Sequence, residues 1–152
     1  MAHAPVPSVL FLCTGNSCRS QMAEGWLRHL AGARFECLSA GTEAHGLNPR
    51  AVEAMAAAGV DIAGARSKTT DGFRASPPDF VVTVCGHAAE SCPTFPGATR
   101  VVHWPFPDPA GATGTDAEIR AEFAAVRDAI RVRIEAWLAA GAPFDAEDAR
   151  AR

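Results

Sequence analysis

The part of this chain that most constrains its fold is an apolar run that leads directly into a loop of small residues. Val9–Leu12 is continuously apolar, as is typical of a buried parallel strand. The next residues read Cys13-Thr14-Gly15-Asn16-Ser17-Cys18-Arg19-Ser20, and apolar residues then recur at helical spacing. A cysteine and an arginine at the two ends of such a strand-to-helix turn predict an oxyanion-binding loop that holds a thiolate.

The physical basis of this prediction is the concentration of positive charge in the turn. The amide N–H groups of such a turn point inward, and the helix behind them adds the positive end of its dipole. Arg19 closes the loop with a planar fork that matches a tetrahedral oxyanion. The same surroundings favour the thiolate of Cys13 and make it a nucleophile. A purely structural role for Cys13 would leave Arg19 unexplained.

The loop residues between and beside Cys13 and Arg19 have distinct expected roles. The expected oxyanion-binding set is Thr14, Gly15, Asn16, Ser17, Cys18, Arg19 and Ser20. Gly15, Asn16 and Ser17 are small and tolerate turns. We expect Asn16 to brace the loop by bonding backbone carbonyls, and Cys18 to point away as a spectator. Ser20 is expected either to hydrogen-bond the Cys13 sulfur or to cap the helix.

Composition narrows the class of protein. The 152 residues predict a single domain over 1–152, with a core from about 8 to 140. The net charge of -3 argues against nucleic acid as a partner, and no apolar run is long enough to cross a membrane. The first eight residues do not resemble a secretory signal, so we expect a cytoplasmic protein. Five cysteines in that compartment indicate catalysis or metal binding rather than structural disulfides.

Strand and helix patterns alternate along the chain. The predicted strands cover 8–12, 34–40, 79–84 and 99–104. The predicted helices run from about 20 to Gly32, from Asn48-Pro49 to Gly59, briefly after Thr70, and from Thr115 to Gly141. This order predicts an α/β fold, a three-layer sandwich in which a four-stranded parallel sheet carries helices on both faces. Ligands of such sheets bind at the carboxyl ends of strands, where Cys13, Cys85 and the loop after Trp104 would converge.

Cys85 and Cys92 form the second notable feature. In one continuous helix their α-carbons would lie about 10 Å apart along the axis, whereas a disulfide needs roughly 4.4–6.8 Å. Oxidation of this pair would therefore require the segment to bend, which Gly86 and the Pro93–Gly97 run would tolerate. Zinc bound by Cys85, His87 and Cys92 is the competing interpretation. That spacing fits no common zinc finger, so we expect no metal.

Asp108 is the expected acid. It lies in Pro107-Asp108-Pro109, where a turn aspartate is common. In its functional role the carboxyl group would be held neutral over the thiolate and would protonate a leaving oxygen. His45, His87 and His103 have no evident partner, and we assign them surface or packing roles.

Four blocks of this sequence together resemble the thioredoxin-coupled arsenate reductases. They are FLCTGNSCRSQMAEG from Phe11, SAGTEAHGLNP from Ser39, VVTVCGHAAESCP from Val81 and HWPFPDPAG from His103. The resemblance runs in order from about residue 8 to 138 and implies the fold of low-molecular-weight tyrosine phosphatases. Those phosphatases usually have proline after the Arg-Ser pair and aromatic residues after the Asp-Pro. This chain has Gln21 and Ala110 there, and it contains no tyrosine.

The resemblance implies a relay of three cysteines that reduces arsenate and serves arsenic detoxification. Cys13 would attack arsenate held by the loop amides and Arg19, while Asp108 protonates the departing oxygen. Cys85 would then attack Cys13, releasing arsenite, and Cys92 would attack Cys85. The Cys85–Cys92 disulfide would be reduced by thioredoxin. Two electrons from a pair of thiols reduce As(V) to As(III), so no cofactor is expected. Phosphate or sulfate would mimic the substrate, and we expect a monomer.

Two alternative functions remain open at this stage. One is a low-molecular-weight protein tyrosine phosphatase that uses the same loop, with Cys85 and Cys92 incidental. The other is a non-enzymatic sensor or carrier that binds arsenite or zinc through its thiols.

One position departs from the resemblance. Some members of the family hold potassium with an asparagine, a glutamate, a serine and an aspartate. The first three match Asn16, Glu24 and Ser39, but the aspartate position falls on Lys68. The ammonium group of Lys68 could occupy the cation site itself, so we predict no potassium requirement.

Overall fold

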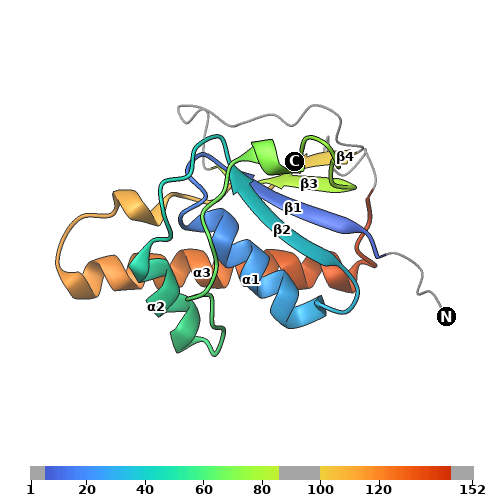
Figure 1. Ribbon diagram of the computed structural model, residues 1–152. Coiled ribbons are helices and arrows are strands. Elements are labelled where there is room, and N and C mark those ends of the chain that lie inside the picture. The colour runs from blue at the N-terminus through green and yellow to red at the C-terminus, as the bar shows by residue number, and fades with distance from the viewer. Residues whose placement is uncertain (1–5, 86–99, 145–152) are drawn as a thin grey trace.

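The computed structural model describes residues 6–85 and 100–144, and in them a parallel sheet is flanked by helices (Figure 1). The strands are β1 (Ser8–Cys13), β2 (Glu36–Gly41), β3 (Phe80–Thr83) and β4 (Arg100–His103). They lie in the order β2-β1-β3-β4, and every neighbouring pair is parallel. All residues of β1 and β3 are buried, which explains why these strands are apolar on both faces. The predicted four-stranded parallel sheet is confirmed, with strand ends shifted by one or two residues.

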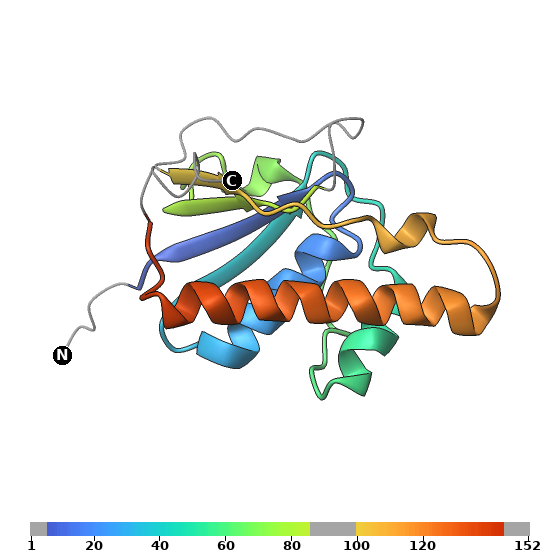
Figure 2. The same ribbon diagram turned by 180° about the vertical axis from the view of Figure 1, so that it is seen from behind.

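Helices flank the sheet on both faces in the described part of the chain. The α-helices are α1 (Arg19–Ala31), α2 (Pro49–Ala57) and α3 (Asp116–Ala139), and they lie on one side of the sheet (Figure 2). The short 3-10 helix η1 (Thr70–Phe73) covers the other face, where Phe73 packs against Leu10, Leu12, Ala40 and Val81. A second 3-10 helix, η2 (Pro109–Gly111), follows β4. The predicted α/β architecture is therefore confirmed.

The helix ends follow from local sequence in two cases and not in a third. Asn48 caps α2 by accepting a hydrogen bond from the amide of Arg50, and Pro49 occupies the first turn. Thr115 and Glu118 form a reciprocal capping box at the start of α3. In α1, however, the cap position is Cys18, and its side chain makes no capping hydrogen bond. Ser20 lies inside the helix, so the capping role considered for it is wrong.

The core forms where α1 and α3 pack on the sheet. The predicted apolar stripe of α3 is buried at Phe123, Val126, Ile130, Ile134 and Trp137. Trp137 stacks on Phe80 of β3, with ring centroids 5.7 Å apart and planes 2° from parallel. Each such buried aromatic side chain stabilises the fold by about 1.5–3 kcal/mol. This packing holds β3 and β1 in place, and β1 in turn carries Cys13 at its last position.

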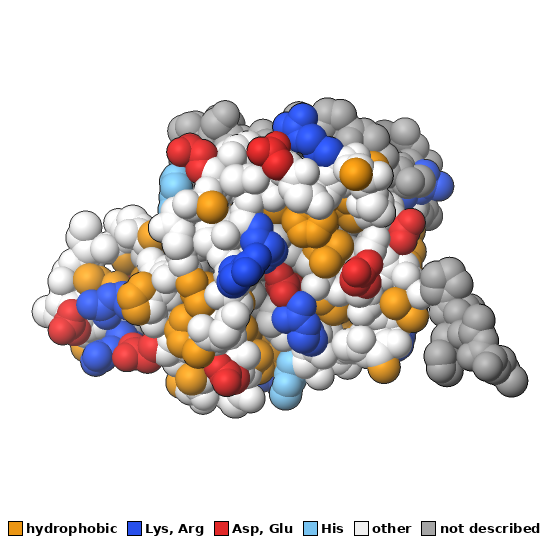
Figure 3. Space-filling model, in the orientation of Figure 1, with side chains coloured by type: hydrophobic (Ala, Val, Ile, Leu, Met, Phe, Trp, Pro, Cys, Tyr) orange, Lys and Arg blue, Asp and Glu red, His pale blue; other side chains and the backbone are white. Residues whose placement is uncertain are grey.

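The surface of the described residues carries charges of both signs. On the face in Figure 3, basic and acidic side chains are interspersed rather than gathered by sign. Such a surface differs from the basic stripe that is typical of nucleic-acid-binding proteins. Among the described helices, none combines the length and the apolar character that a membrane span requires.

Candidate active site

The carboxyl ends of β1, β3 and β4 bring the predicted site residues to one edge of the sheet. Cys13 ends β1, and β1 lies beside β3 with Leu12 opposite Thr83. The amide of Val84 donates to the carbonyl of Leu12 over 2.9 Å, so the pairing continues one residue beyond β3. Val84 therefore lies opposite Cys13, and Cys85 follows one residue farther along. The side chains of Cys13 and Cys85 are both buried, with exposed fractions of 3% and 1%.

The loop after β1 turns its carbonyl groups outward. Four successive carbonyl oxygens accept hydrogen bonds from other parts of the chain: Thr14 from the amide of Glu43, Gly15 from the amide of His45, Asn16 from Nε2 of Gln21, and Ser17 from the amide of Asn48. In a trans peptide the C=O and the next N–H point in opposite directions. The amides of residues 15–18 therefore face the inside of the loop, as an oxyanion-binding loop requires.

Two backbone features make this loop geometry possible. Asn16 has a φ of +48°, a left-handed conformation that asparagine adopts more readily than most residues. Gly41, at the end of β2, lies directly against the loop. A Cβ atom there would lie 2.6 Å from the carbonyl oxygen of Thr14 and 2.8 Å from the amide nitrogen of Asn16. Only glycine allows β2 and the loop to approach this closely.

The loop encloses a cavity of about 290 Å³. Its walls are formed by Cys13, Thr14, Gly15, Ser17, Cys18, Arg19, His45, Asp108 and Ala110. None of these described lining residues is a phenylalanine, tyrosine or tryptophan. The cavity thus contains the cysteine, the arginine and the aspartate that the sequence singled out.

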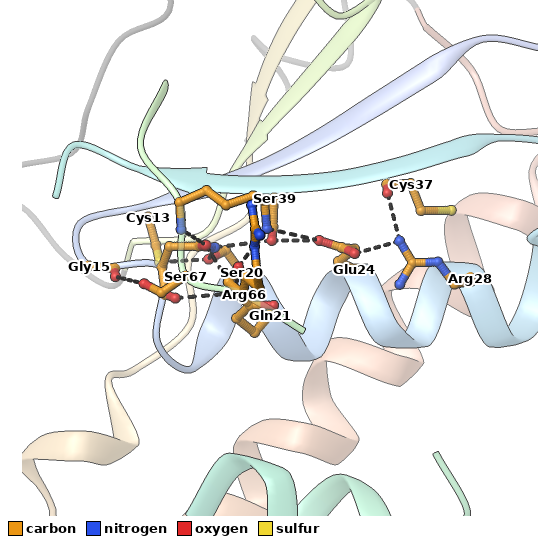
Figure 4. A network of polar contacts seen from close by, with 12 residues as sticks. Cys13, Gly15, Ser20, Gln21, Glu24, Arg28, Cys37, Ser39, Arg66 and Ser67 are labelled. Atoms are coloured by element: carbon orange, nitrogen blue, oxygen red, sulfur yellow. Dashed lines mark hydrogen bonds and ion pairs between the residues drawn. The ribbon is translucent and has the colours of Figure 1, made fainter. Parts of the chain in front are cut away.

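The side chains of Asn16 and Ser20 do not line the cavity but support the loop from behind, and Figure 4 shows Ser20 beside Cys13. Oδ1 of Asn16 accepts a hydrogen bond from the amide of Lys68 over 2.7 Å. Because a backbone amide can only donate, this contact fixes the orientation of the Asn16 side chain, and Nδ2 must be the donor on its other side. The side chain therefore accepts from a backbone amide instead of bonding carbonyls, and that detail of the sequence-based expectation is wrong.

The orientation of Asn16 leaves the Ser20 proton available to Cys13. Nδ2 of Asn16 donates to Oγ of Ser20 over 2.7 Å. Oγ of Ser20 lies 2.9 Å from Sγ of Cys13, and either of these two atoms can be the donor. When the hydroxyl donates, the contact stabilises a negative charge on the sulfur. The expected contact between Ser20 and the Cys13 sulfur is present.

Arg19 and Asp108 close the other side of the cavity. Arg19 is 4% exposed, and its Nη1 donates to the carbonyl of Phe106 over 3.2 Å. Its Nη2 lies 3.7 Å from Oδ2 of Asp108, whose side chain is 46% exposed. Asp108 also accepts a hydrogen bond from the amide of Ala110 at the start of η2. The guanidinium is therefore held in place by β4's outgoing loop, with its charge beside the cavity.

The side chain of Cys18 lies in the cavity wall, contrary to expectation. We expected its side chain to point away from the loop, but it lines the cavity and is only 2% exposed. Alternation of side chains is a property of strands, and it does not apply to a loop whose backbone turns at each residue. Burial raises the pKa of Cys18 to about 11, so it stays protonated at neutral pH.

The histidines and the remaining cysteine are placed as follows. His45, to which the sequence analysis gave a surface or packing role, lines the cavity beside Gly15. His45 lies in the sequence block that begins at Ser39, which is one of the four that carry the resemblance, and this was the signal that could have indicated a role at the site. Nδ1 of His103 lies 2.7 Å from the hydroxyl of Thr83, away from that cavity's lining. His87 and Cys92 lie outside the described residues.

A polar cluster lies behind the loop at Glu24, Ser39 and Lys68. Oγ of Ser39 accepts from Nδ2 of Asn16 over 3.0 Å and donates to Glu24 over 2.6 Å. Nζ of Lys68 lies 3.9 Å from the same Glu24 oxygen and donates to the carbonyl of Arg66. Burial lowers the pKa of Lys68, while the charge of Glu24 acts in the opposite direction. Asn16, Glu24 and Ser39, which match the cation site, thus lie in one polar cluster with Lys68, whose ammonium group is itself a cation.

A protein-family model described as low molecular weight phosphotyrosine protein phosphatase matches residues 8–147. The chain belongs to this family. Its curated relatives include an arsenate reductase of Halalkalibacterium halodurans, 52% identical over 133 residues, and one of Bacillus subtilis, 49% identical over 133 residues. Each alignment covers 88% of this chain and 96% of the relative. These identities place the protein among the arsenate reductases of the family.

Solved structures agree with this placement. An arsenate reductase in the phosphate binding state superposes with a TM-score of 0.74 at 30% identity, covering 88% of this chain and 98% of the other. A thioredoxin-dependent arsenate reductase of Corynebacterium glutamicum gives 0.63 at 28% identity, covering 91% of this chain and 65% of the other. A low molecular weight protein tyrosine phosphatase from T. tengcongensis, 24% identical with a TM-score of 0.67, shares the fold.

Proposed function

We propose that this protein reduces arsenate to arsenite through a relay of Cys13, Cys85 and Cys92, and that thioredoxin regenerates it. The observation that carries the proposal is the juxtaposition of two cysteines at the ends of neighbouring strands. The register places Val84 opposite Cys13, and Cys85 is the next residue. A one-residue diagonal between strands about 4.8 Å apart, with a rise of about 3.3 Å per residue, is about 6 Å, and the α-carbons of a disulfide lie roughly 4.4–6.8 Å apart. Hydrolysis of a phosphate ester would need only the first cysteine, whereas reduction needs both.

The proposed chemistry starts at the Cys13 sulfur. The thiolate, stabilised by the Ser20 hydroxyl, attacks arsenic in an arsenate held by the inward amides and Arg19. Asp108 in its protonated form gives its proton to the departing oxygen, which leaves as water. Attack of the Cys85 sulfur on Cys13 then forms a disulfide. The electron pair of the sulfur–arsenic bond stays on arsenic, so As(V) becomes As(III) and leaves as arsenite.

The last steps restore Cys13. Cys92 attacks Cys85 by ordinary thiol–disulfide exchange, frees Cys13 and leaves a disulfide between residues 85 and 92. Thioredoxin supplies two electrons and two protons to reduce that disulfide. This role of thioredoxin is supported by the structural relative from C. glutamicum, which is a thioredoxin-dependent arsenate reductase. Such a cycle needs a compartment that keeps thiols reduced, and we place the protein in the cytoplasm on that ground.

A protein tyrosine phosphatase is the second candidate, because the family model carries that description. The lining of the cavity favours the reductase. Among the described residues that line it there is no phenylalanine, tyrosine or tryptophan to stack on an aryl group, and its volume of about 290 Å³ accommodates a small oxyanion.

The decisive experiment is consumption of NADPH in the presence of thioredoxin, thioredoxin reductase and arsenate. We expect sustained turnover for the unmodified protein, none for Cys13→Ser, and at most one turnover per molecule for Cys92→Ser. Multiple turnovers by Cys92→Ser with thioredoxin alone would contradict the three-cysteine relay. Replacing thioredoxin by glutaredoxin or glutathione in the same assay identifies the reductant.

A further inference from the structure

We propose that His45 is a further oxyanion-binding residue whose imidazolium form attracts the anion to the cavity around Cys13. The proposal rests on the proposed function in one respect, namely that this cavity binds a tetrahedral oxyanion. It adds a residue from the segment after β2 to a site otherwise built by the loop, Arg19 and Asp108. It also adds a consequence, which is that the affinity for the anion falls as pH rises.

The position of His45 against the loop is tightly constrained. Its backbone amide donates to the carbonyl of Gly15 over 2.9 Å, and the amide of Glu43 donates to the carbonyl of Thr14 over 3.0 Å. The ring fills the space beside Gly15, since a Cβ atom on Gly15 would lie 2.4 Å from Nδ1 of His45. The histidine is therefore attached to the loop and forms part of the cavity wall.

The two ring nitrogens face different surroundings. Nε2 lies 3.3 Å from Oε1 of Glu43. A carboxylate only accepts hydrogen bonds, so Nε2 carries a proton in either charge state of the ring. Nδ1, on the edge that faces Gly15, is then an acceptor in the neutral ring and a donor in the imidazolium. Protonation of Nδ1 therefore adds a positive charge and a hydrogen-bond donor to this part of the cavity wall.

The charge balance at the cavity mouth leads to the same expectation. Glu43 does not line the cavity, but its carboxylate lies 3.3 Å from His45; with a neutral ring this negative charge is unbalanced, and protonation of His45 neutralises it. The other charged or titratable groups of the cavity are Cys13, Cys18, Arg19 and Asp108. Cys18 stays neutral, because burial raises its pKa to about 11, and arginine stays charged. Histidine is the side chain that ordinarily changes charge between about pH 5 and 8.

Sulfate binding measured by calorimetry tests the proposal. Sulfate stays doubly charged across this range, whereas arsenate and phosphate change their own charge near neutrality. The background is Cys13→Ser, which removes the titration of the thiol. We expect its sulfate affinity to fall about two- to fivefold between about pH 6 and pH 8, the size of one exposed ion pair. Adding His45→Gln should abolish this pH dependence and leave the weaker affinity at both values.

Three further variants separate the charge of His45 from other effects. His29→Gln removes an exposed histidine of α1 and should leave the pH dependence unchanged. His45→Arg keeps a permanent charge and should bind sulfate well at both pH values, even if His45→Gln fails to fold. Glu43→Gln should raise the affinity most at high pH, where its charge is unbalanced.

The outcomes distinguish this proposal from the proposed function. Sulfate binding that keeps its pH dependence in His45→Gln, or that lacks it in the Cys13→Ser background, overturns the role of His45 and leaves the oxyanion site intact. Failure of sulfate, phosphate and arsenate to bind to the unmodified protein overturns the oxyanion site itself.

Discussion

Replacement of Ser20 by alanine tests how the structure stabilises the Cys13 thiolate. Ser20 is fully buried, its hydroxyl is 2.9 Å from the Cys13 sulfur, and its oxygen already accepts a hydrogen bond from Asn16, which leaves its proton available to a thiolate. A hydrogen bond to a charged group contributes about 1.5–3 kcal/mol. Since about 1.4 kcal/mol corresponds to one pH unit, Ser20→Ala should raise the pH midpoint of thiolate formation by about 1–2 units. Water cannot readily replace the hydroxyl at so buried a position.

The assay is the rate of iodoacetamide alkylation as a function of pH, read by intact mass in a Cys85→Ser/Cys92→Ser background. Cys18 and Cys37 remain in that background, but burial raises the pKa of each to about 11. They stay protonated through the neutral range, and a single adduct reports Cys13. Below the midpoint, each unit of upward shift lowers the alkylation rate tenfold, because only the thiolate reacts.

Ser67→Ala is the matched control. It removes an identical hydroxyl from the same region, but that hydroxyl donates to the outward carbonyl of Gly15 over 3.1 Å rather than to the sulfur. Its midpoint should stay within about 0.3 units of the background, since it changes the free energy of the thiolate little. If Ser20→Ala shifts the midpoint no more than Ser67→Ala does, the directional hydrogen bond deduced from Asn16 is wrong.

Three further predictions concern stability and ions. Gly41→Ala should destabilise the fold by about 1–3 kcal/mol in urea unfolding, because its Cβ would lie 2.6 Å from a backbone oxygen, whereas Gly72→Ala, with open space around it, should not. Thr115→Ala should cost about 1 kcal/mol through loss of the α3 capping box, and an equal loss in the exposed Thr113→Ala would contradict that reason. Turnover and melting temperature should be the same in potassium as in sodium, since Lys68 already places a cation 3.9 Å from Glu24; a large gain in potassium would refute this.

Several features of the fold follow from short stretches of sequence. The strand before Cys13, the caps at Asn48 and Thr115, and the apolar stripe of α3 all lie where the sequence predicts them. Each depends on interactions within a few residues, which the order of side chains specifies directly. The placement of Cys13 and Arg19 at the two ends of one loop is local in the same sense, because a turn of this length between a strand and a helix can adopt few backbone conformations.

Errors arose where contacts between distant segments decide the outcome. Two roles were expected for Ser20. Its contact with the Cys13 sulfur is present, but it does not cap α1, because it lies inside the helix and also accepts from Asn16. Cys18 was judged by an alternation that loops do not follow. His45 is exposed, as expected of a surface residue, but the pairing of its amide with Gly15 also makes it part of the cavity wall, which the sequence did not indicate.

The sequence by itself determined the class of chemistry, because the nucleophile, the arginine and the helix behind them lie within eight consecutive residues. Only the tertiary structure decided which distant groups complete the site. Parallel strands join residues that are far apart in the chain, and their register brings the carboxyl ends of β1, β2, β3 and β4 to one edge of the sheet. The segments that leave these ends carry His45 and Asp108 to the cavity at the end of β1. No local pattern contains that register, since it is a property of the assembled sheet.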